Sequence, residues 1–400
     1  VHELKSHYPP YDLLREAAPE AFDEMVAACW RAHVYDWARL DFSRHGRMDL
    51  PDSPLPPAPW GAHYVGGDIF FIGGGLTFIN AGSDLYYAAA SLSRLSNRPA
   101  PLTWARRLMG RYEETRHPRT GMSGYTFSSI FDKSDPERKR SGDRALKQFR
   151  EQFPEHDPKE GTLTTTGALR AIAATSALCR LRLARDLGAP AGAAFGHSAA
   201  ADQLAYGKWA YDSADSTFHP VFTDGFRLTG QRIAQSGYYG PAGQVFAPRS
   251  GDGLFFWAYA AGWRFCRDEA LWTIARNIGL HAGLGEIGAR PGERPRLTPP
   301  PGPDSPAWCF GLLELDEEFP GAGFLPAATD LAQRIIAERF HEGLFAAKDA
   351  PVVGADAIEA VALLHVAARL TGRTEAAPVF CSSSPLTPLS GWTREGDAGV

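Results

Sequence analysis

The sequence lacks any segment long and apolar enough to span a membrane as a helix. Its longest apolar stretch, residues 254–263, is about half of the roughly 20 residues that such a helix needs, so we expect it in a core. The first residues, Val-His-Glu-Leu-Lys, also lack the apolar region of a signal peptide. We therefore predict a cytoplasmic or periplasmic protein with no membrane partner. A periplasmic location would require an export segment before Val1 that has been removed.

Cysteine is scarce, with five residues in 400, and these are spaced too widely for a zinc or redox motif. Most of them stand among apolar neighbours. Buried thiols in a reducing compartment explain this pattern better than a disulfide framework. The sequence also has neither a Gly-x-Ser-x-Gly elbow nor a local cysteine-protease signature, so a serine or cysteine hydrolase is poorly supported.

An excess of basic charge is absent, since 41 Lys and Arg stand against 46 Asp and Glu and give a net charge of −5. Nucleic-acid binders usually carry a basic face, so we expect no nucleic-acid partner. The glycine-rich stretch 280–288 lacks the preceding strand and the Lys-Ser/Thr pair of a phosphate-binding loop, and we predict a helix end that runs into a loop. An acidic substrate is still possible, because a protein with a negative net charge can have a locally basic cleft.

What the chain does have is helical periodicity. Apolar residues recur at three- and four-residue spacing from Phe22 to Trp37, as in an amphipathic helix. The same pattern, with Ser198 as the cap of the fifth helix, predicts helices over 19–40, 81–95, 102–116, 164–187, 199–211, 253–265, 269–280, 307–315, 328–336 and 355–370. Strands and helices do not alternate. We therefore predict an all-α helical toroid that forms one domain over 1–400, and the absence of a fixed repeat favours a closed barrel over a solenoid.

One stretch, residues 112–121 (Tyr-Glu-Glu-Thr-Arg-His-Pro-Arg-Thr-Gly), concentrates charged and turn-forming residues. Pro118 follows Arg116 and His117 directly and stops a helix, so both side chains are expected at a helix end, where they can converge on a ligand. An Arg beside an imidazole suits an acidic substrate. A capped helix end with surface ion pairs is the competing interpretation.

Two more ligand-type residues, His63 and Asp84, also stand near predicted turns. With His117 they supply two imidazoles and one carboxylate, a donor set that suits Mn, Ni, Co or Zn better than Ca. Each has a structural alternative. A lone His often serves packing, and Asp84 stands where the N-cap or the first turn of a helix is expected. Arg44-His45-Gly46 is a competing site with its own alternative as a helix C-cap.

Several pieces of the chain, in this order, resemble polysaccharide lyase family two, the pectate lyases of enteric and plant-associated bacteria. The pieces are 31–37, 44–46, Gly82-Ser83-Asp84-Leu85-Tyr86, Arg116-His117-Pro118 with Gly121 and Gly124-Tyr125, and 271–288. They are scattered over about residues 20 to 290. Each piece is modest, and their order along the chain is the better evidence.

This resemblance implies an (α/α)7 barrel that cleaves polygalacturonate by β-elimination with a divalent metal, Mn²⁺ in the first place and Ni²⁺, Co²⁺ or Ca²⁺ as alternatives. It implies Arg116 as the Brønsted base and His63, Asp84 and His117 as metal ligands. The family has Glu where this chain has Asp84, which puts metal preference and activity in question. Basic and aromatic residues in or near an irregular segment are candidates for the acidic-sugar subsites: Tyr125, Lys208, Arg227, Tyr238 and Arg249.

These residue types make chemical sense for an elimination. The reaction removes the proton beside the uronate carboxylate, and a cation on that carboxylate acidifies the proton. A guanidinium normally stays protonated. Arg116 therefore has a second interpretation, bidentate binding of the carboxylate, with Tyr112 or Tyr125 taking the proton.

Two other functions stay open. A different enzyme of the helical-toroid type, such as an unsaturated glucuronyl hydrolase or a sugar epimerase, would use acid–base chemistry without a metal. A non-catalytic sugar-binding or scaffold protein would use the Arg116–His117 turn only as a cap. For the leading hypothesis, a pectate lyase, we expect a monomer that acts on an acidic polysaccharide or oligosaccharide.

Overall fold

The computed structural model describes residues 11–38, 40–42, 60, 77–114, 116–123, 126–127, 152, 154, 168–237, 240–298, 306–346 and 358–381 of the chain. Its contacts form two compact units. Unit 1 comprises residues 1–210, 219–248 and 383–385, and unit 2 comprises residues 211–218, 249–382 and 386–400. The single barrel domain over 1–400 concerns how these units combine and stays a prediction.

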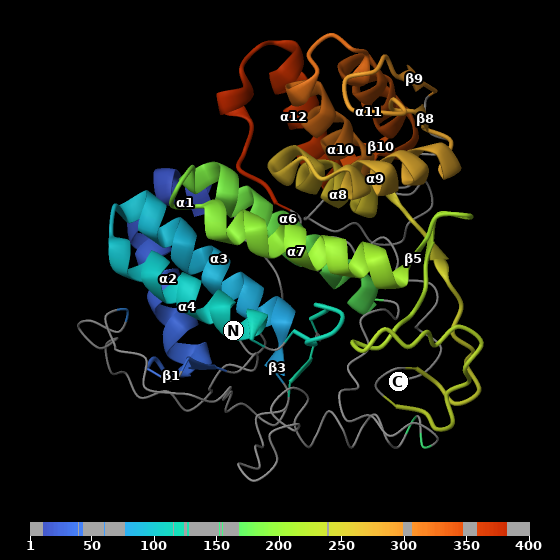
Figure 1. The fold of residues 1–400 in the computed structure, drawn as a ribbon. Coiled ribbons are helices and arrows are strands. Elements are labelled where there is room, and N and C mark those ends of the chain that lie inside the picture. The colour runs from blue at the N-terminus through green and yellow to red at the C-terminus, as the bar shows by residue number, and fades with distance from the viewer. Residues whose placement is uncertain are drawn as a thin grey trace. The chain divides into compact units, whose positions relative to one another are not determined.

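Unit 1 is built from antiparallel helix pairs (Figure 1). α3 packs on α4 and α6 packs on α7, each pair joined by a short loop, and α3 also packs on α6. The helices are α1 (Tyr11–Ala17), α2 (Pro19–His33), α3 (Ile79–Ser96), α4 (Pro99–Glu113), α6 (Ala168–Leu187) and α7 (Ala193–Ala210). Two short antiparallel strand pairings accompany them, β1 (Val34–Asp36) with β2 (Asp41–Phe42) and β3 (Thr77–Phe78) with β4 (Thr126–Phe127).

Unit 2 is also helical. Its helices are α8 (Gly253–Cys266), α9 (Glu269–His281), α10 (Ala307–Glu318), α11 (Phe324–Arg339) and α12 (Ile358–Leu370), followed by the short 3-10 helix η2 (Thr374–Ala376). Its strands are two residues each: β5 (Tyr211–Asp212), β6 (Thr217–Phe218), β7 (Arg249–Ser250), β8 (Gly285–Glu286), β9 (Arg296–Leu297), β10 (Phe340–His341) and β11 (Leu344–Phe345). α8 packs on both α9 and α10, so its buried side chains form the centre of this unit.

Local sequence explains where these helices begin. Asp252 and Asp268 stand just before α8 and α9, and each carboxylate accepts a backbone N–H of the first turn, from Phe255 and Ala270. α2 and α4 begin with Pro19 and Pro99 instead, where the missing N–H of proline costs no helical bond.

Aromatic side chains fill the core of unit 1. Trp30, Trp60 and Trp104 meet edge to face, with ring centroids 5.4 Å apart for Trp30–Trp60 and for Trp60–Trp104. Trp30 and Trp104 are almost fully buried. Such aromatic contacts add stabilisation beyond the apolar area they bury. Through Trp60, this cluster links α2, which carries Trp30, to α4, which carries Trp104.

The predicted all-α class is confirmed. The helix predicted over 19–40 ends at His33, because residues 34–36 pair with residues 41–42 as a strand. The helix predicted over 199–211 begins at Ala193. Ser198 therefore lies inside α7, and its predicted role as the helix cap is wrong.

Most of the described cysteine side chains are buried, as the sequence predicts. Cys179, Cys309 and Cys381 are buried, Cys266 is half-buried, and all four are free. Burial raises the pKa of Cys309 to about 12, which makes it inert. Within the part of the chain that the structure describes, no helix has the length and apolar character to cross a membrane.

Candidate active site

The turn after α4 closes on itself through its backbone. The helix ends at Glu113, and the N–H of Arg116 donates to the Glu113 carbonyl at 3.1 Å. The N–H of His117 donates to Met122 at 3.0 Å, and the N–H of Gly121 returns to the His117 carbonyl at 2.8 Å. Gly121 has φ +73°, a conformation that costs other residues energy. The predicted helix end is confirmed, and its side chains project from a fixed loop.

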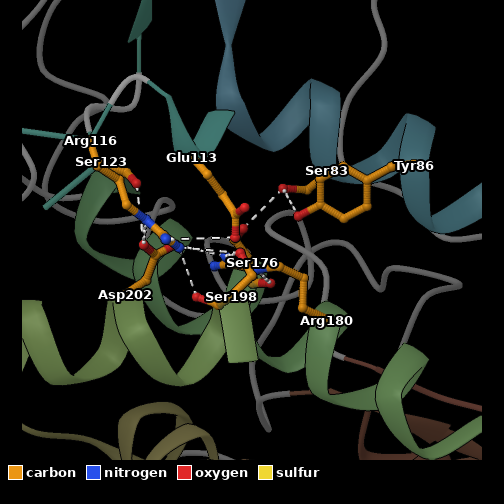
Figure 2. A network of polar contacts seen from close by, with 9 residues as sticks. All are labelled: Ser83, Tyr86, Glu113, Arg116, Ser123, Ser176, Arg180, Ser198 and Asp202. Carbon is orange, nitrogen blue, oxygen red and sulfur yellow. Dashed lines mark hydrogen bonds and ion pairs between the residues drawn. The ribbon is translucent and has the colours of Figure 1, made fainter. Parts of the chain in front are cut away.

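Arg116 is bound along one edge of its guanidinium group (Figure 2). Its Nε donates to Asp202 Oδ1 at 2.8 Å. Its Nη2 donates to the carbonyl and the hydroxyl of Ser198, at 3.0 and 3.2 Å. Nη1 lies 3.6 Å from Glu113 Oε1, a longer ion pair. The Arg116 side chain is 20% exposed, and Nη1 is the guanidinium nitrogen with the longest of these contacts.

A second cation lies behind this pair. Arg180 Nη1 is 2.7 Å from Asp202 Oδ2, and the Arg180 side chain is only 7% exposed. Burial by itself would raise the pKa of Asp202, but Arg180 and then Arg116 outweigh it and hold this pKa below its usual value. Burial likewise opposes the charge of Arg180, and the Asp202 carboxylate more than compensates and raises its pKa. Asp202 is therefore a carboxylate shared by two guanidinium groups.

The polar contacts continue from α6 to α3. Arg180 Nε donates to the Ser176 carbonyl at 3.1 Å. The Ser176 hydroxyl is 2.9 Å from the Ser83 hydroxyl, which accepts a bond from Tyr86 at 3.0 Å. All four side chains are buried. Figure 2 shows that this network joins the turn after α4 to α7, α6 and the first half of α3.

The far side of the turn faces the loop of residues 219–226. Arg119 donates to the Asp224 carbonyl at 2.5 Å, and its guanidinium carbon lies 5.9 Å from the Trp209 ring centroid. Lys208 Nζ lies at the same distance from this ring. Both distances suit a cation–π contact. Arg119 and Lys208 thus add two exposed cations beside the turn that carries Arg116.

His117 is buried and makes turn-stabilising contacts. Its Nδ1 accepts from the backbone N–H of Arg119 at 3.2 Å and from that of Thr120 at 3.4 Å. A metal-ligating imidazole needs a lone pair for the metal. With Nδ1 accepting, a neutral His117 carries its proton on Nε2, so in this conformation the ring does not fit the predicted role of metal ligand.

The other predicted ligands are only partly covered by the structure. His63 lies outside the described residues, as does the competing site at 44–46. Asp84 lies inside α3, which begins at Ile79, so its interpretation as an N-cap is wrong. Its side chain is outside the described set. Among the described residues, no three His, Cys, Asp or Glu side chains gather into a metal-binding group.

The predicted subsite residues also differ in outcome. Tyr125 and Tyr238 lie outside the described residues. Lys208 stands beside the turn, as above. Arg227 is exposed in the loop of unit 1, where its backbone bridges Val221. Arg249 is exposed in β7 of unit 2, and the two units are not placed relative to each other.

Sequence reasoning missed Asp202 and Arg180. Each is a single charge inside an apolar or Ala-rich run, Ala-Ala-Ala-Asp-Gln in α7 and Leu-Cys-Arg-Leu in α6. A lone charge on an otherwise buried helix face is rare unless it is paired, and this signal could have singled out both residues. It would not have shown that they pair with Arg116.

The chain is similar to one known protein family over most of its length. The family model described as periplasmic pectate lyase matches residues 1–387. A pectate disaccharide-lyase of Dickeya dadantii (strain 3937) is 28% identical over 369 residues, which cover 86% of this chain and 62% of the relative. The chain therefore spans less than two thirds of the length of that relative.

Two solved structures have low similarity to the chain. A cellobiose 2-epimerase from Bacillus thermoamylovorans B4167 has a TM-score of 0.47 at 10% identity, covering 84% of this chain and 76% of its own. A family 76 glycoside hydrolase from a bovine Bacteroides thetaiotaomicron strain has a TM-score of 0.43 at 12% identity, covering 84% and 60%.

Proposed function

Because the chain belongs to the periplasmic pectate lyase family, we propose that it cleaves galacturonate polysaccharides or oligosaccharides by β-elimination. The family predicted from the sequence is confirmed by this match. The name of the Dickeya relative, a pectate disaccharide-lyase, supports the same substrate class. The family description also supports the periplasm over the cytoplasm, and the monomeric state stays a prediction.

The observation that carries this proposal is the cationic turn after α4. Arg116 and Arg119 belong to one closed backbone loop, and Arg119 and Lys208 both lie 5.9 Å from the Trp209 ring centroid. A galacturonate chain carries one carboxylate on each sugar ring, so several neighbouring cations suit it better than they suit a neutral sugar. Arginine in addition matches the planar geometry of a carboxylate.

The reaction breaks a C–H and a C–O bond and forms a C=C double bond and an O–H bond. The C–H bond beside the uronate carboxylate breaks, its electron pair forms a C=C bond, and the glycosidic C–O bond breaks on the adjacent carbon. The leaving oxygen takes up a proton, and no water is consumed. Negative charge develops on the carboxylate in between, so a fixed cation at this position stabilises the transition state more than the bound substrate.

We assign that position to Arg116. Its Nε and Nη2 are bound by Asp202 and Ser198, so the Nη1 edge would meet the uronate carboxylate in exchange for the longer contact with Glu113. The family resemblance implies a different role for Arg116, that of the base. A base must first lose its own proton, whereas the carboxylate of Asp202 stabilises the cation, so the contacts support the electrostatic role. Buried Tyr112 remains a candidate for the base.

A divalent metal stays part of the proposal on the family resemblance alone, with His63, Asp84 and His117 as its ligands and Mn²⁺ as the first candidate. When bound, such an ion supplies Lewis-acid polarisation of the carboxylate. The described conformation of His117 does not fit this role, so no step is assigned to the ion.

The test is incubation of the full chain with polygalacturonate in the presence of Mn²⁺, Ni²⁺, Co²⁺ or Ca²⁺. Elimination gives an unsaturated product that absorbs ultraviolet light, and mass spectrometry shows fragments lighter by one water than hydrolysis products. Hydrolysis without absorbance would support a hydrolase, and isomerised sugar of unchanged mass would support an epimerase. Binding without any turnover would support a sugar-binding protein. Each of these three outcomes would exclude the lyase.

A further inference from the structure

We propose that Asp202 is the positioning residue for Arg116 and that Arg180 holds the Asp202 carboxylate in place. The kinetic part of this inference rests on the proposed lyase function. Its structural part depends only on the polar network drawn in Figure 2.

The two oxygens of Asp202 are divided between the two arginines. Oδ1 accepts from Arg116 Nε at 2.8 Å, and Oδ2 lies 2.7 Å from Arg180 Nη1. The Ser123 hydroxyl adds a bond of 3.3 Å to Oδ1. Both oxygens therefore have donors, and the carboxylate plane is fixed from two sides.

Ser198 completes the template on the same helix. It stands four residues before Asp202 in α7, so the two side chains share one helix face. Its hydroxyl lies 3.2 Å from Arg116 Nη2 and 2.8 Å from Arg180 Nη1. Because a guanidinium group is planar, binding of Nε and Nη2 determines the direction of the Nη1 edge, which is the edge proposed to meet the substrate.

The network also reaches the other predicted part of the site. From Arg180 it continues through Ser176 to Ser83, the residue next to Asp84 in α3. The backbone turn with Arg116 and the stretch of α3 that contains Asp84 are thus attached to one buried cluster. A residue inside this cluster can set the position of Arg116 without touching the substrate.

Unit 2 provides a matched control for the pairing. Asp316 Oδ2 accepts from Arg369 Nε at 2.8 Å, the same contact as in Asp202–Arg116, and the Asp316 side chain is 5% exposed. A change at Asp316 removes an ion pair of comparable geometry, whereas Arg116 keeps all its partners. The Asp316 variants therefore distinguish an effect on the position of Arg116 from a general loss of protein stability.

The kinetic experiment compares Asp202→Asn and Asp202→Glu with Asp316→Asn and Asp316→Glu on polygalacturonate, with rates corrected for the folded fraction. The Glu variant of Asp202 keeps the charge and moves the carboxylate by one methylene. We expect kcat to fall about 100-fold for Asp202→Asn and about 10-fold for Asp202→Glu, as misplacement of a reacting group does. KM should change less than about threefold, because Arg116 acts on the transition state more than on binding. Unchanged kcat in Asp202→Glu, or equal losses in the Asp316 variants, would overturn the proposal.

A spectroscopic readout keeps the inference testable if the wild type has no lyase activity. The Nε–H resonance of Arg116 is identified by its absence in Arg116→Lys. We expect it to exchange slowly with solvent in the wild type and in Asp316→Asn, and to shift and exchange faster in Asp202→Glu. An unchanged resonance in Asp202→Glu would show that Asp202 does not position Arg116. Absence of any unsaturated product, in contrast, would refute only the proposed function.

Discussion

Arg116 and Asp202 are joined by a hydrogen bond of 2.8 Å between Nε and Oδ1, although 86 residues separate them in sequence. The bond connects a surface turn to the middle of α7. It gives the arginine a direction that the turn alone would not give, because a long side chain on a loop otherwise samples several rotamers. Arg116 thus resembles a preorganised group more than a surface charge.

Replacement of Arg116 should abolish most of the lyase activity. We expect Arg116→Ala to lower kcat by about 10²- to 10³-fold, the usual cost of removing one preorganised donor to a developing charge. Steady-state rates of unsaturated product formation measure this effect. Arg182→Ala is the matched control, since Arg182 pairs with Asp186 at 2.9 Å and is 21% exposed, as Arg116 is 20% exposed. Near-normal activity of Arg116→Ala would remove this residue from the catalytic role.

The shared carboxylate makes stability depend on pH in a defined window. The pKa of Asp202 in the folded protein is lowered, and that of an unfolded Asp is about 3.9. Its contribution is therefore fully present above about pH 4 to 5, and it is lost as the pH falls through the lower, folded pKa. Urea unfolding of the wild type and of Asp202→Asn at several pH values measures this. We expect their difference in unfolding free energy to shrink as the pH falls below about 4, and a constant difference would contradict the assignment.

The sequence predicts some elements of the fold and the site better than others. Pro118 correctly placed Arg116 and His117 at a helix end, because a proline ring excludes the preceding turn of helix. The start of α7 was missed because Gly196 and the Gly-rich approach to Ala193 mask the helical pattern. The sequence pattern therefore predicts Ser198 as a cap, whereas it lies inside α7.

The pairing within the Asp202 network had no local signature. A carboxylate in an Ala-rich helix is visible in the sequence, but its partners Arg116 and Arg180 come from other elements. Which of many charges pair depends on tertiary packing, which periodicity does not encode. Sequence reasoning therefore located the turn and missed what holds its arginine.

Two glycines on either side of the helix end should respond in opposite ways to alanine. Gly121 has φ +73°, so Gly121→Ala should lower the free energy of unfolding by about 1–2 kcal/mol. Gly110 lies within α4, and an added Cβ there meets nothing within 4 Å. Gly110→Ala should therefore raise stability by about 0.5–1 kcal/mol. Urea denaturation of both variants measures this, and stabilisation by Gly121→Ala would contradict the turn geometry.

Lys208 should affect substrate binding more than chemistry. Its ammonium group lies beside Trp209 and near the turn, exposed and without a role in the buried network. We expect Lys208→Gln to raise KM for polygalacturonate about three- to tenfold, with kcat changed less than about twofold, because a uniform binding contact is lost. The effect should weaken at high salt. Arg290→Gln, an exposed arginine of unit 2, serves as the control, and an unchanged KM for Lys208→Gln would exclude this residue from the substrate site.

His117 decides between the turn seen here and the metal site that the family resemblance implies. Its Nδ1 satisfies two backbone amides, Arg119 and Thr120, so His117→Ala should cost about 1–2 kcal/mol of stability in chelator, as loss of partners for buried donors does. His117→Asn, whose side-chain oxygen can replace Nδ1, should cost less.

Metal binding at His117 would have to change those two bonds, because a neutral ring has one lone pair. If His117 is a ligand, Zn²⁺ should shift the amide resonances of Arg119 and Thr120 in the wild type and leave them unchanged in His117→Ala. If Zn²⁺ leaves both amides in place in the wild type while activity still depends on a divalent ion, then the ion binds elsewhere. The predicted trio of His63, Asp84 and His117 would then be wrong for this chain, and His117 would serve only to hold the turn from which Arg116 projects.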